Sequence, residues 1–164
     1  MSNFIIYVDG SYNAKTHIYG GGYLILAYDL GMLNTKKSKI GYFNGNHATV
    51  LSQRQIVGEC GALLIALQKL SKVFDQSVDT LEIRFDYIGL EHWYLGSWKA
   101  KKPVALNYII GLQPYRGLLK PEMFSHIRGH TGELGNEYVD KVARFSVGVD
   151  KSLPRPPYFA TDPL

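Results

Sequence analysis

The stretch that decides the fold is FIIYVDGSYN, residues 4–13, in which an apolar run stops at Asp9 and gives way to glycine, serine and asparagine. Alternate side chains of a strand face the same way, so Ile5 and Tyr7 share a face with Asp9. Both faces are apolar up to that point, which predicts a central strand over 4–9. A carboxylate at the end of a buried strand must find a partner or lose its proton. Asp9 is therefore the first candidate functional residue.

Hydrophobic periodicity predicts the remaining elements. The sequence predicts strands over 19–29, 37–46, 80–86 and 122–128, and helices over 55–74, 88–98, 104–117 and 136–147. Short loops between the first three strands favour an antiparallel meander. In the second strand, Gly20–Gly22 indicates either a close backbone approach or a bulge. The order of elements predicts an α/β domain with a mixed sheet and helices on its faces.

Composition limits the class of protein. The 164 residues fit one domain, which we place at 1–150, followed by a tail over 151–164 that holds four of the seven prolines. The sequence contains no run of about eighteen apolar residues, so it predicts no membrane span. The first residues lack the features of a signal peptide. The single cysteine, Cys60, suits a reducing cytoplasm. The net charge of +4 favours a polyanionic partner, though weakly.

Four carboxylates occupy positions that an apolar element would otherwise fill: Asp9, Glu59, Asp86 and Asp140. Each alone is typical of a turn former or a helix cap. Together, however, strand ends and the first turns of a covering helix can meet at one edge of a sheet, where crowded carboxylates need a cation. Ligands that are all oxygen suit Mg²⁺ or Mn²⁺, and two such ions can support attack of water on a phosphodiester. The four acids therefore indicate a nuclease.

The same segments resemble the ribonuclease H type 1 family. The resemblance lies in YVDGSYN and YGGGYLI near the start, RQIVGECGALLIAL, IRFDYIGLEHWYLGSWKAKKP and HIRGHTGELGNEYVDKVA. It covers about residues 4–147, and the fourth segment is similar to a bacterial subgroup that often carries a viroplasmin-like hybrid-binding domain. The resemblance implies a ribonuclease H-like fold with a mixed five-stranded sheet, three strands antiparallel and then two parallel, flanked by helices.

The resemblance also implies roles for individual residues. The metal-binding acids become Asp9, Glu59, Asp86 and Asp140, and the catalytic loop histidine becomes His130. Two Mg²⁺ ions, or Mn²⁺ in their place, would support cleavage of the RNA strand of an RNA–DNA hybrid, leaving 3′-hydroxyl and 5′-phosphate ends. The substrate-binding residues become Gly10, Ser11, Tyr12, Asn13 and Gln55, together with the lysines Lys99, Lys101 and Lys102. We expect the protein to be a cytoplasmic monomer that binds the RNA–DNA hybrid. We expect no association with a membrane.

Two histidines, three aromatic residues and the function itself each have an alternative interpretation. His126 and His130 have the spacing of a zinc pair, but they fall on a strand and a loop and need not share a face. We favour core packing for Trp93, Tyr94 and Trp98 over base stacking. The alternatives to a ribonuclease H are a DNA-directed nuclease or resolvase on the same fold, and a nucleic-acid-binding module without catalysis.

Overall fold

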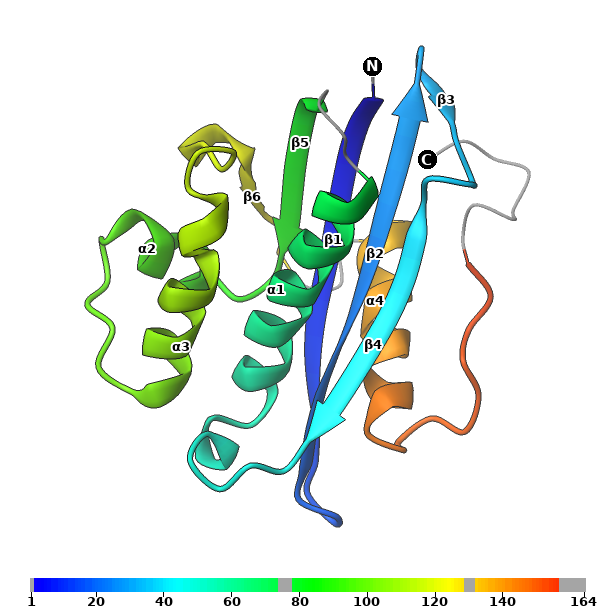
Figure 1. Cartoon of the computed structure of the whole chain (residues 1–164). Coiled ribbons are helices and arrows are strands. Elements are labelled where there is room, and N and C mark those ends of the chain that lie inside the picture. Colours follow the sequence, from blue (N-terminus) through cyan, green and yellow to red (C-terminus); the bar gives the residue numbers. More distant parts are fainter. Residues whose placement is uncertain (1, 74–77, 129–131, 157–164) are drawn as a thin grey trace.

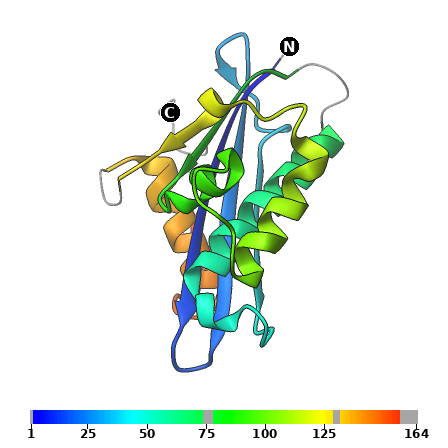
Figure 2. The same cartoon turned by 90° about the vertical axis from the view of Figure 1, so that its left-hand side faces the viewer.

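The computed structural model describes residues 2–73, 78–128 and 132–156. A mixed sheet forms the centre of the molecule, and helices cover both of its faces (Figures 1 and 2). Within these described ranges, no helix is both long enough and apolar enough to cross a membrane.

The sheet is built around β1 (Ser2–Asn13). On one side β1 pairs antiparallel with β2 (Ile18–Asp29), and on the other side it pairs parallel with β5 (Val78–Phe85). The short β6 (Phe124–His126) extends the sheet beyond β5, again in parallel. This arrangement confirms the predicted sheet, in which antiparallel strands precede parallel ones.

The third antiparallel strand, predicted over 37–46, is present over 39–45, and a short strand that was not predicted precedes it. β3 (Met32–Leu33) and β4 (Lys39–Gly45) pair with different parts of the same edge of β2. Leu30 and Gly31, with φ of 53° and 76°, form the tight turn into β3, and such left-handed pairs are favoured in two-residue hairpins. The sheet therefore keeps five strand positions although the structure describes six strands.

Two sets of helices cover the two faces. α1 (Gln55–Val73) packs on one face beside α3 (Pro103–Leu112), and α4 (Leu134–Ser146) packs on the other. Figure 2 shows α1 and α4 on opposite sides of the sheet. Short 3₁₀ helices, η1 (Leu51–Gln53), η2 (Gln113–Tyr115) and η3 (Pro121–Met123), complete the helical segments.

The helices that follow β5 are shorter than predicted. α2 (Gly89–Leu95) ends early because Gly96 adopts the left-handed conformation common after helix ends. α3 begins with Pro103 at its first turn and passes into η2 at Gln113, because the next residue, Pro114, cannot donate a helical hydrogen bond.

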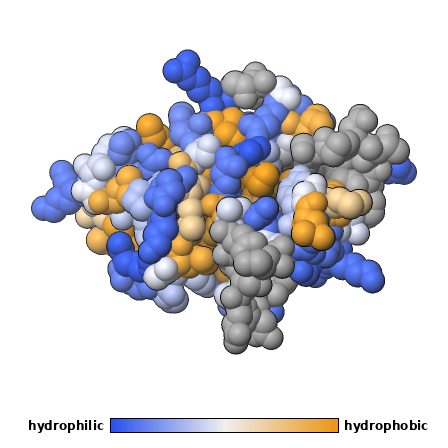
Figure 3. Space-filling model, turned by 90° about the horizontal axis from the view of Figure 1, so that it is seen from above, coloured by the Kyte–Doolittle hydropathy of each residue, from blue (hydrophilic) through white to orange (hydrophobic). Residues whose placement is uncertain are grey.

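The core has two layers, one on each face of the sheet. Phe4, Ile6 and Val8 face α1, whereas Tyr7 faces α4, so the predicted division of the first strand into two faces is confirmed. The predicted apolar stripe of α1 is also buried, as Leu63, Leu67 and Leu70 are each at most 1% exposed; Phe74, the last member, lies outside the described residues. Seen from above, hydrophobic residues lie among hydrophilic ones on the described surface (Figure 3).

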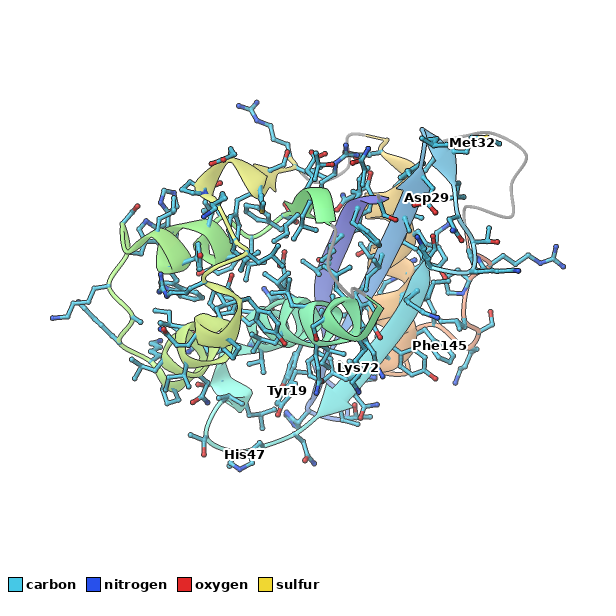
Figure 4. All side chains as sticks on the ribbon, turned by 45° about the horizontal axis from the view of Figure 1, so that its top comes forward. Tyr19, Asp29, Met32, His47, Lys72 and Phe145 are labelled. Atoms are coloured by element: carbon cyan, nitrogen blue, oxygen red, sulfur yellow. The ribbon has the colours of Figure 1, made fainter. Side chains whose placement is uncertain are left out.

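Glycines bring both helices close to one half of the β1–β2 hairpin. A methyl group added at Gly21 would lie 2.1 Å from the carbonyl oxygen of Gly58 in α1, and one added at Gly22 would lie 2.6 Å from Val142 in α4. Gly20–Gly22 therefore serves close approach, one of the two predicted possibilities. In Figure 4, Tyr19 marks this half of the hairpin, whereas Asp29 and Met32 lie at its other end.

Candidate active site

Asp9 lies inside β1 and not at the end of a strand. β1 continues to Asn13 because its backbone stays paired with β2, so the prediction that the strand ends at Asp9 is wrong. The parallel partner β5 stops pairing at the Tyr7–Arg84 position. Asp9 thus lies beyond the carboxyl end of β5, where the edge of β1 that faces β5 is no longer paired with it.

Glu59 joins α1 to the end of β5. Its side chain is only 4% exposed, and its Oε1 accepts hydrogen bonds of 3.1 Å from the backbone N–H groups of both Asp86 and Tyr87. Gly10 permits this position, since a Cβ there would lie 2.7 Å from the backbone nitrogen of Glu59. The buried carboxylate therefore lies beneath the loop that carries Asp86.

Three of the four acids open onto one hollow of about 270 Å³. Asp9 comes from β1, Asp86 follows β5, and Asp140 comes from the middle of α4. The structure therefore brings together three carboxylates that lie far apart in the sequence, with Glu59 bonded to the backbone of one of them.

The acids at this hollow affect each other's protonation. Burial, followed by the neighbouring carboxylates of Glu59 and Asp140, raises the pKa of Asp9 to about 8. Burial also raises the pKa of Glu59 to about 7, although the N–H groups of Tyr87 and Asp86 partly oppose this effect. Ionised together, these carboxylates would repel each other in a poorly hydrated place.

A divalent cation would relieve this repulsion, and the donor set is chemically suited to one. Carboxylate oxygens are the ligands that Mg²⁺ and Mn²⁺ prefer. In the described part of the chain, however, no group of three or more His, Cys, Asp or Glu side chains is arranged as a formed metal site. The carboxylates thus have the ligand chemistry that such a metal ion prefers, but they are not arranged as a complete coordination shell.

The substrate-binding residues expected from the sequence fall in two places. Gly10, Ser11, Tyr12 and Asn13 follow Asp9 along β1, and Gln55 begins α1 beside them, its carbonyl oxygen 2.0 Å from where a Cβ of Gly10 would lie. The three lysines, Lys99, Lys101 and Lys102, are exposed on the loop between α2 and α3. Figure 1 shows that loop on the far side of α1 from β4.

Two of these side chains also have partners within the protein. Asn13 donates to the carbonyl oxygen of Val147 (2.9 Å) and accepts from the backbone N–H of Lys15 (3.0 Å). The hydroxyl of Tyr12 lies 3.0 Å from Nδ1 of His17. Both side chains thus support the β1–β2 turn. His130 lies outside the described residues, so the zinc spacing that it has with His126 is not tested.

Sequence reasoning missed several residues around the acids. Asn136, Glu137, Lys141 and Arg144 line the hollow together with Asp140. For Asn136, Glu137 and Arg144, the available signal was their spacing of three or four residues from Asp140, because such residues share a helix face. His126, which the sequence raised only as part of a zinc pair, was not expected beside the acids. Its Nε2 lies 2.7 Å from the carbonyl oxygen of Asp86, since β6 places it opposite Phe85.

The aromatic residues after β5 follow the prediction only in part. Tyr94 is 7% exposed and donates to the carbonyl oxygen of Leu119, as core packing requires. Trp98 is instead 40% exposed and stacks on His92, with ring centroids 5.0 Å apart. Core packing is therefore wrong for Trp98, because the residues after Gly96 no longer belong to a helix that faces the core.

The fold belongs to the ribonuclease H class. It is similar to the N-terminal RNase H domain of rv2228c from Mycobacterium tuberculosis, with a TM-score of 0.65, 16% identity, and coverage of 90% of this chain and 94% of that one. It is also similar to LC11-RNase H1, isolated from compost (TM-score 0.63, 22% identity, 90% and 96% covered). A further structure of LC11-RNase H1, in complex with an RNA/DNA hybrid, matches with a TM-score of 0.57 at 23% identity over 85% and 98%.

A sequence relative makes the assignment more specific. The chain is 29% identical over 148 residues to a ribonuclease H of Thermosynechococcus vestitus (strain NIES-2133 / IAM M-273 / BP-1), covering 85% of each protein. No family model matches the chain. The resemblance found in the sequence is thus supported by an independent similarity: over most of its length the chain is similar to a ribonuclease H, and members of that family generally use divalent metal ions.

Proposed function

We propose that this protein is an endoribonuclease that hydrolyses the RNA strand of RNA–DNA hybrids and leaves 3′-hydroxyl and 5′-phosphate ends. The observation that carries the proposal is the common hollow of Asp9, Asp86 and Asp140, three carboxylates from three elements. The related LC11-RNase H1 is known in complex with an RNA/DNA hybrid, which supports this substrate class.

The acids would hold two Mg²⁺ ions, with Mn²⁺ as a possible replacement. Asp9 and Asp140 would bind one ion, and Asp9, Glu59 and Asp86 the other. When bound, such ions activate water and neutralise charge at a phosphodiester. Asp9 is held for this work by its place in a paired strand, and its Oδ1 accepts a 2.9 Å hydrogen bond from the N–H of Gly10.

Selection of RNA would come from the 2′-hydroxyl of the ribose. The backbone of Gly10–Tyr12 and the carboxylate of Glu59 lie beside Asp9, where they would meet that hydroxyl. Asn13 and Gln55 would contact bases or sugars from the same edge, and the exposed lysines of the α2–α3 loop would contact phosphates of the DNA strand. His130 would accept or deliver a proton and assist product release.

The decisive experiment compares substrates. Purified protein with Mg²⁺ is expected to cut a labelled RNA–DNA hybrid and to leave duplex DNA and duplex RNA intact, with no cleavage in EDTA. Equal cutting of duplex DNA would favour a DNA-directed nuclease, and tight binding without cleavage of any substrate would favour a binding module. Either result would overturn the proposal.

Substitution of the acids tests the site itself. Asp9→Asn and Asp86→Asn should each lower kcat by about a thousand-fold or more, because the charge that binds the metal is lost. Both variants should keep their fold, since removing one of several crowded charges relieves repulsion. Thermal melts serve as the control: a collapsed variant would mean that the acid is structural.

His130→Ala should reduce the rate less severely than Asp9→Asn. A proton-transfer residue contributes about a hundred- to ten-thousand-fold at most, and water can replace part of that role. Single-turnover and steady-state rates should be measured together, because a role in product release would lower only the steady-state rate. A single-turnover rate as low as that of Asp9→Asn would contradict this role.

We further propose a single catalytic domain over 1–150 with a separate tail over 151–164, and a cytoplasmic monomer. The lone cysteine, which is buried, supports a reducing compartment. Size-exclusion chromatography with light scattering tests the monomer.

A further inference from the structure

Arg144 lies between a candidate metal ligand and an acid that comes just before the C-terminal tail. Its Nη1 is 3.4 Å from Oδ2 of Asp140, one turn earlier in α4, and its Nε donates a 3.0 Å hydrogen bond to Oδ2 of Asp150. Each of the three side chains is between 35% and 41% exposed. One guanidinium is thus shared by two carboxylates, only one of which lines the hollow.

The backbone fixes the position of Asp150. The N–H groups of Val149 and Asp150 both donate to the carbonyl oxygen of Arg144, at 3.0 and 3.4 Å, and Gly148 makes the turn with φ of 78°. Figure 1 shows the chain leaving α4 at this point and running back beside it. None of these bonds involves the side chain of Arg144 or of Asp150, so substitution of either side chain leaves the turn in place.

A guanidinium beside a carboxylate competes with a metal ion for it. The planar guanidinium of Arg can contact two carboxylates in different directions at once. Because both share one positive charge, each carboxylate weakens the attraction between the guanidinium and the other. Removing Asp150 would leave Arg144 to pair with Asp140 alone. Removing Arg144 would leave the full charge of Asp140 available to a cation.

We propose that Asp150 competes with Asp140 for Arg144 and thereby sets the metal affinity of Asp140. Arg144 is a positioning residue that acts through Asp140, and Asp150 acts only through Arg144. The inference rests on the proposed function, in which Asp140 is a metal ligand. It gives the residue just before the tail a role at the active site.

Calorimetric titration with Mn²⁺ in the absence of nucleic acid tests this coupling. Asp150→Asn should weaken Mn²⁺ binding by about two- to five-fold, the range expected for a partly exposed ion pair. Arg144→Gln should strengthen Mn²⁺ binding by a similar factor. In the double variant, Asp150→Asn should add no further change, because the residue through which it acts is gone.

The double variant separates coupling from a general effect of charge. If Asp150→Asn weakens Mn²⁺ binding equally with and without Arg144, the carboxylate acts through space and the inference is wrong. Lys72→Ala is the matched control, since Lys72 is an exposed cation at the end of α1 (Figure 4). Tighter Mn²⁺ binding by Lys72→Ala, equal to that of Arg144→Gln, would also overturn the inference.

Asp140→Asn distinguishes this inference from the proposed function. It should weaken Mn²⁺ binding by more than any other variant of the series. If Asp140→Asn binds Mn²⁺ as the unmodified protein does, the metal-site assignment fails. If Asp140→Asn weakens Mn²⁺ binding but the Arg144 and Asp150 variants leave it unchanged, the proposed coupling is wrong and the metal-site assignment stands. Should Arg144→Gln unfold at the assay temperature, Arg144→Lys replaces it and should still reduce the effect of Asp150→Asn, because an ammonium lacks the two-sided geometry.

Discussion

The two halves of the β1–β2 hairpin pack against the same helices with very different residues. Near Asp29, large side chains such as Phe4, Ile6, Leu24 and Leu26 fill the space between sheet and helices. Beyond Asp9, glycines replace them and the helix backbones approach the strands directly. The first half therefore supplies stability, whereas the second half brings carboxylates from three elements within reach of each other.

The largest effect on stability is expected in the first half. Leu67→Ala, at a position that is 1% exposed, should lower the free energy of unfolding by about 2–5 kcal/mol, through lost burial and the cavity that remains. Urea unfolding measures this loss, and kcat should stay near that of the unmodified protein at temperatures where the variant is folded. Ile110→Ala is the control, because Ile110 is 67% exposed and should change stability by less than about 0.5 kcal/mol.

A smaller loss of stability with a larger loss of activity is expected in the second half. A methyl group added at Gly58 would lie 1.6 Å from the carbonyl oxygen of Gly20, so Gly58→Ala must push α1 away from β2. We expect a net cost of about 1–3 kcal/mol, although alanine is intrinsically better than glycine in a helix. Because Glu59 moves with α1, kcat should fall by about ten-fold or more.

Gly117→Ala provides the comparison for this prediction, since a methyl group there meets no atom within 4 Å. It should leave both stability and kcat nearly unchanged. Unchanged activity in Gly58→Ala would mean that close approach of α1 is not needed to form the site.

The smallest effect is a dependence of stability on pH that is specific to the second half. The pKa of Asp9 is raised by burial and by Glu59 to about 8, so the folded protein without metal prefers its protonated form. This contribution is complete at low pH and is lost as pH rises from about 4 towards 8. The metal-free protein should thus be less stable at pH 8 than at pH 5, by an amount on the order of 1 kcal/mol from Asp9.

Urea unfolding in EDTA at the two pH values measures this difference. Asp9→Asn should reduce it, and saturating Mg²⁺ should oppose it, because the metal binds the ionised acids. Asp29→Asn is the control in the first half. The hydroxyl of Ser2 and the amide of Asn34 hold the pKa of Asp29 near 2, so its contribution changes only at lower pH. An unaltered pH dependence in Asp9→Asn would remove Asp9 as its cause.

Most elements could be predicted from the sequence because periodicity reports which side chains share a face. The strand from Phe4 to Val8 and the buried stripe of Leu63, Leu67 and Leu70 follow directly from this rule. Element ends were less predictable: β1 continues past Asp9 because backbone pairing with β2 does not require apolar side chains. The tight turn at Leu30 lacked a typical turn residue at its first position, so β3 was missed.

The sequence by itself determined the class of fold, the resemblance to ribonuclease H and the four acids proposed as ligands. Only the tertiary structure decided how those acids are held: Glu59 beneath the Asp86 loop, Asp140 beside Arg144, and Arg144 shared with Asp150. The physical reason is distance along the chain. Local patterns encode the faces of helices and strands, whereas contacts between remote residues depend on how closely those elements pack, which here is set by Gly10, Gly20–Gly22 and Gly58.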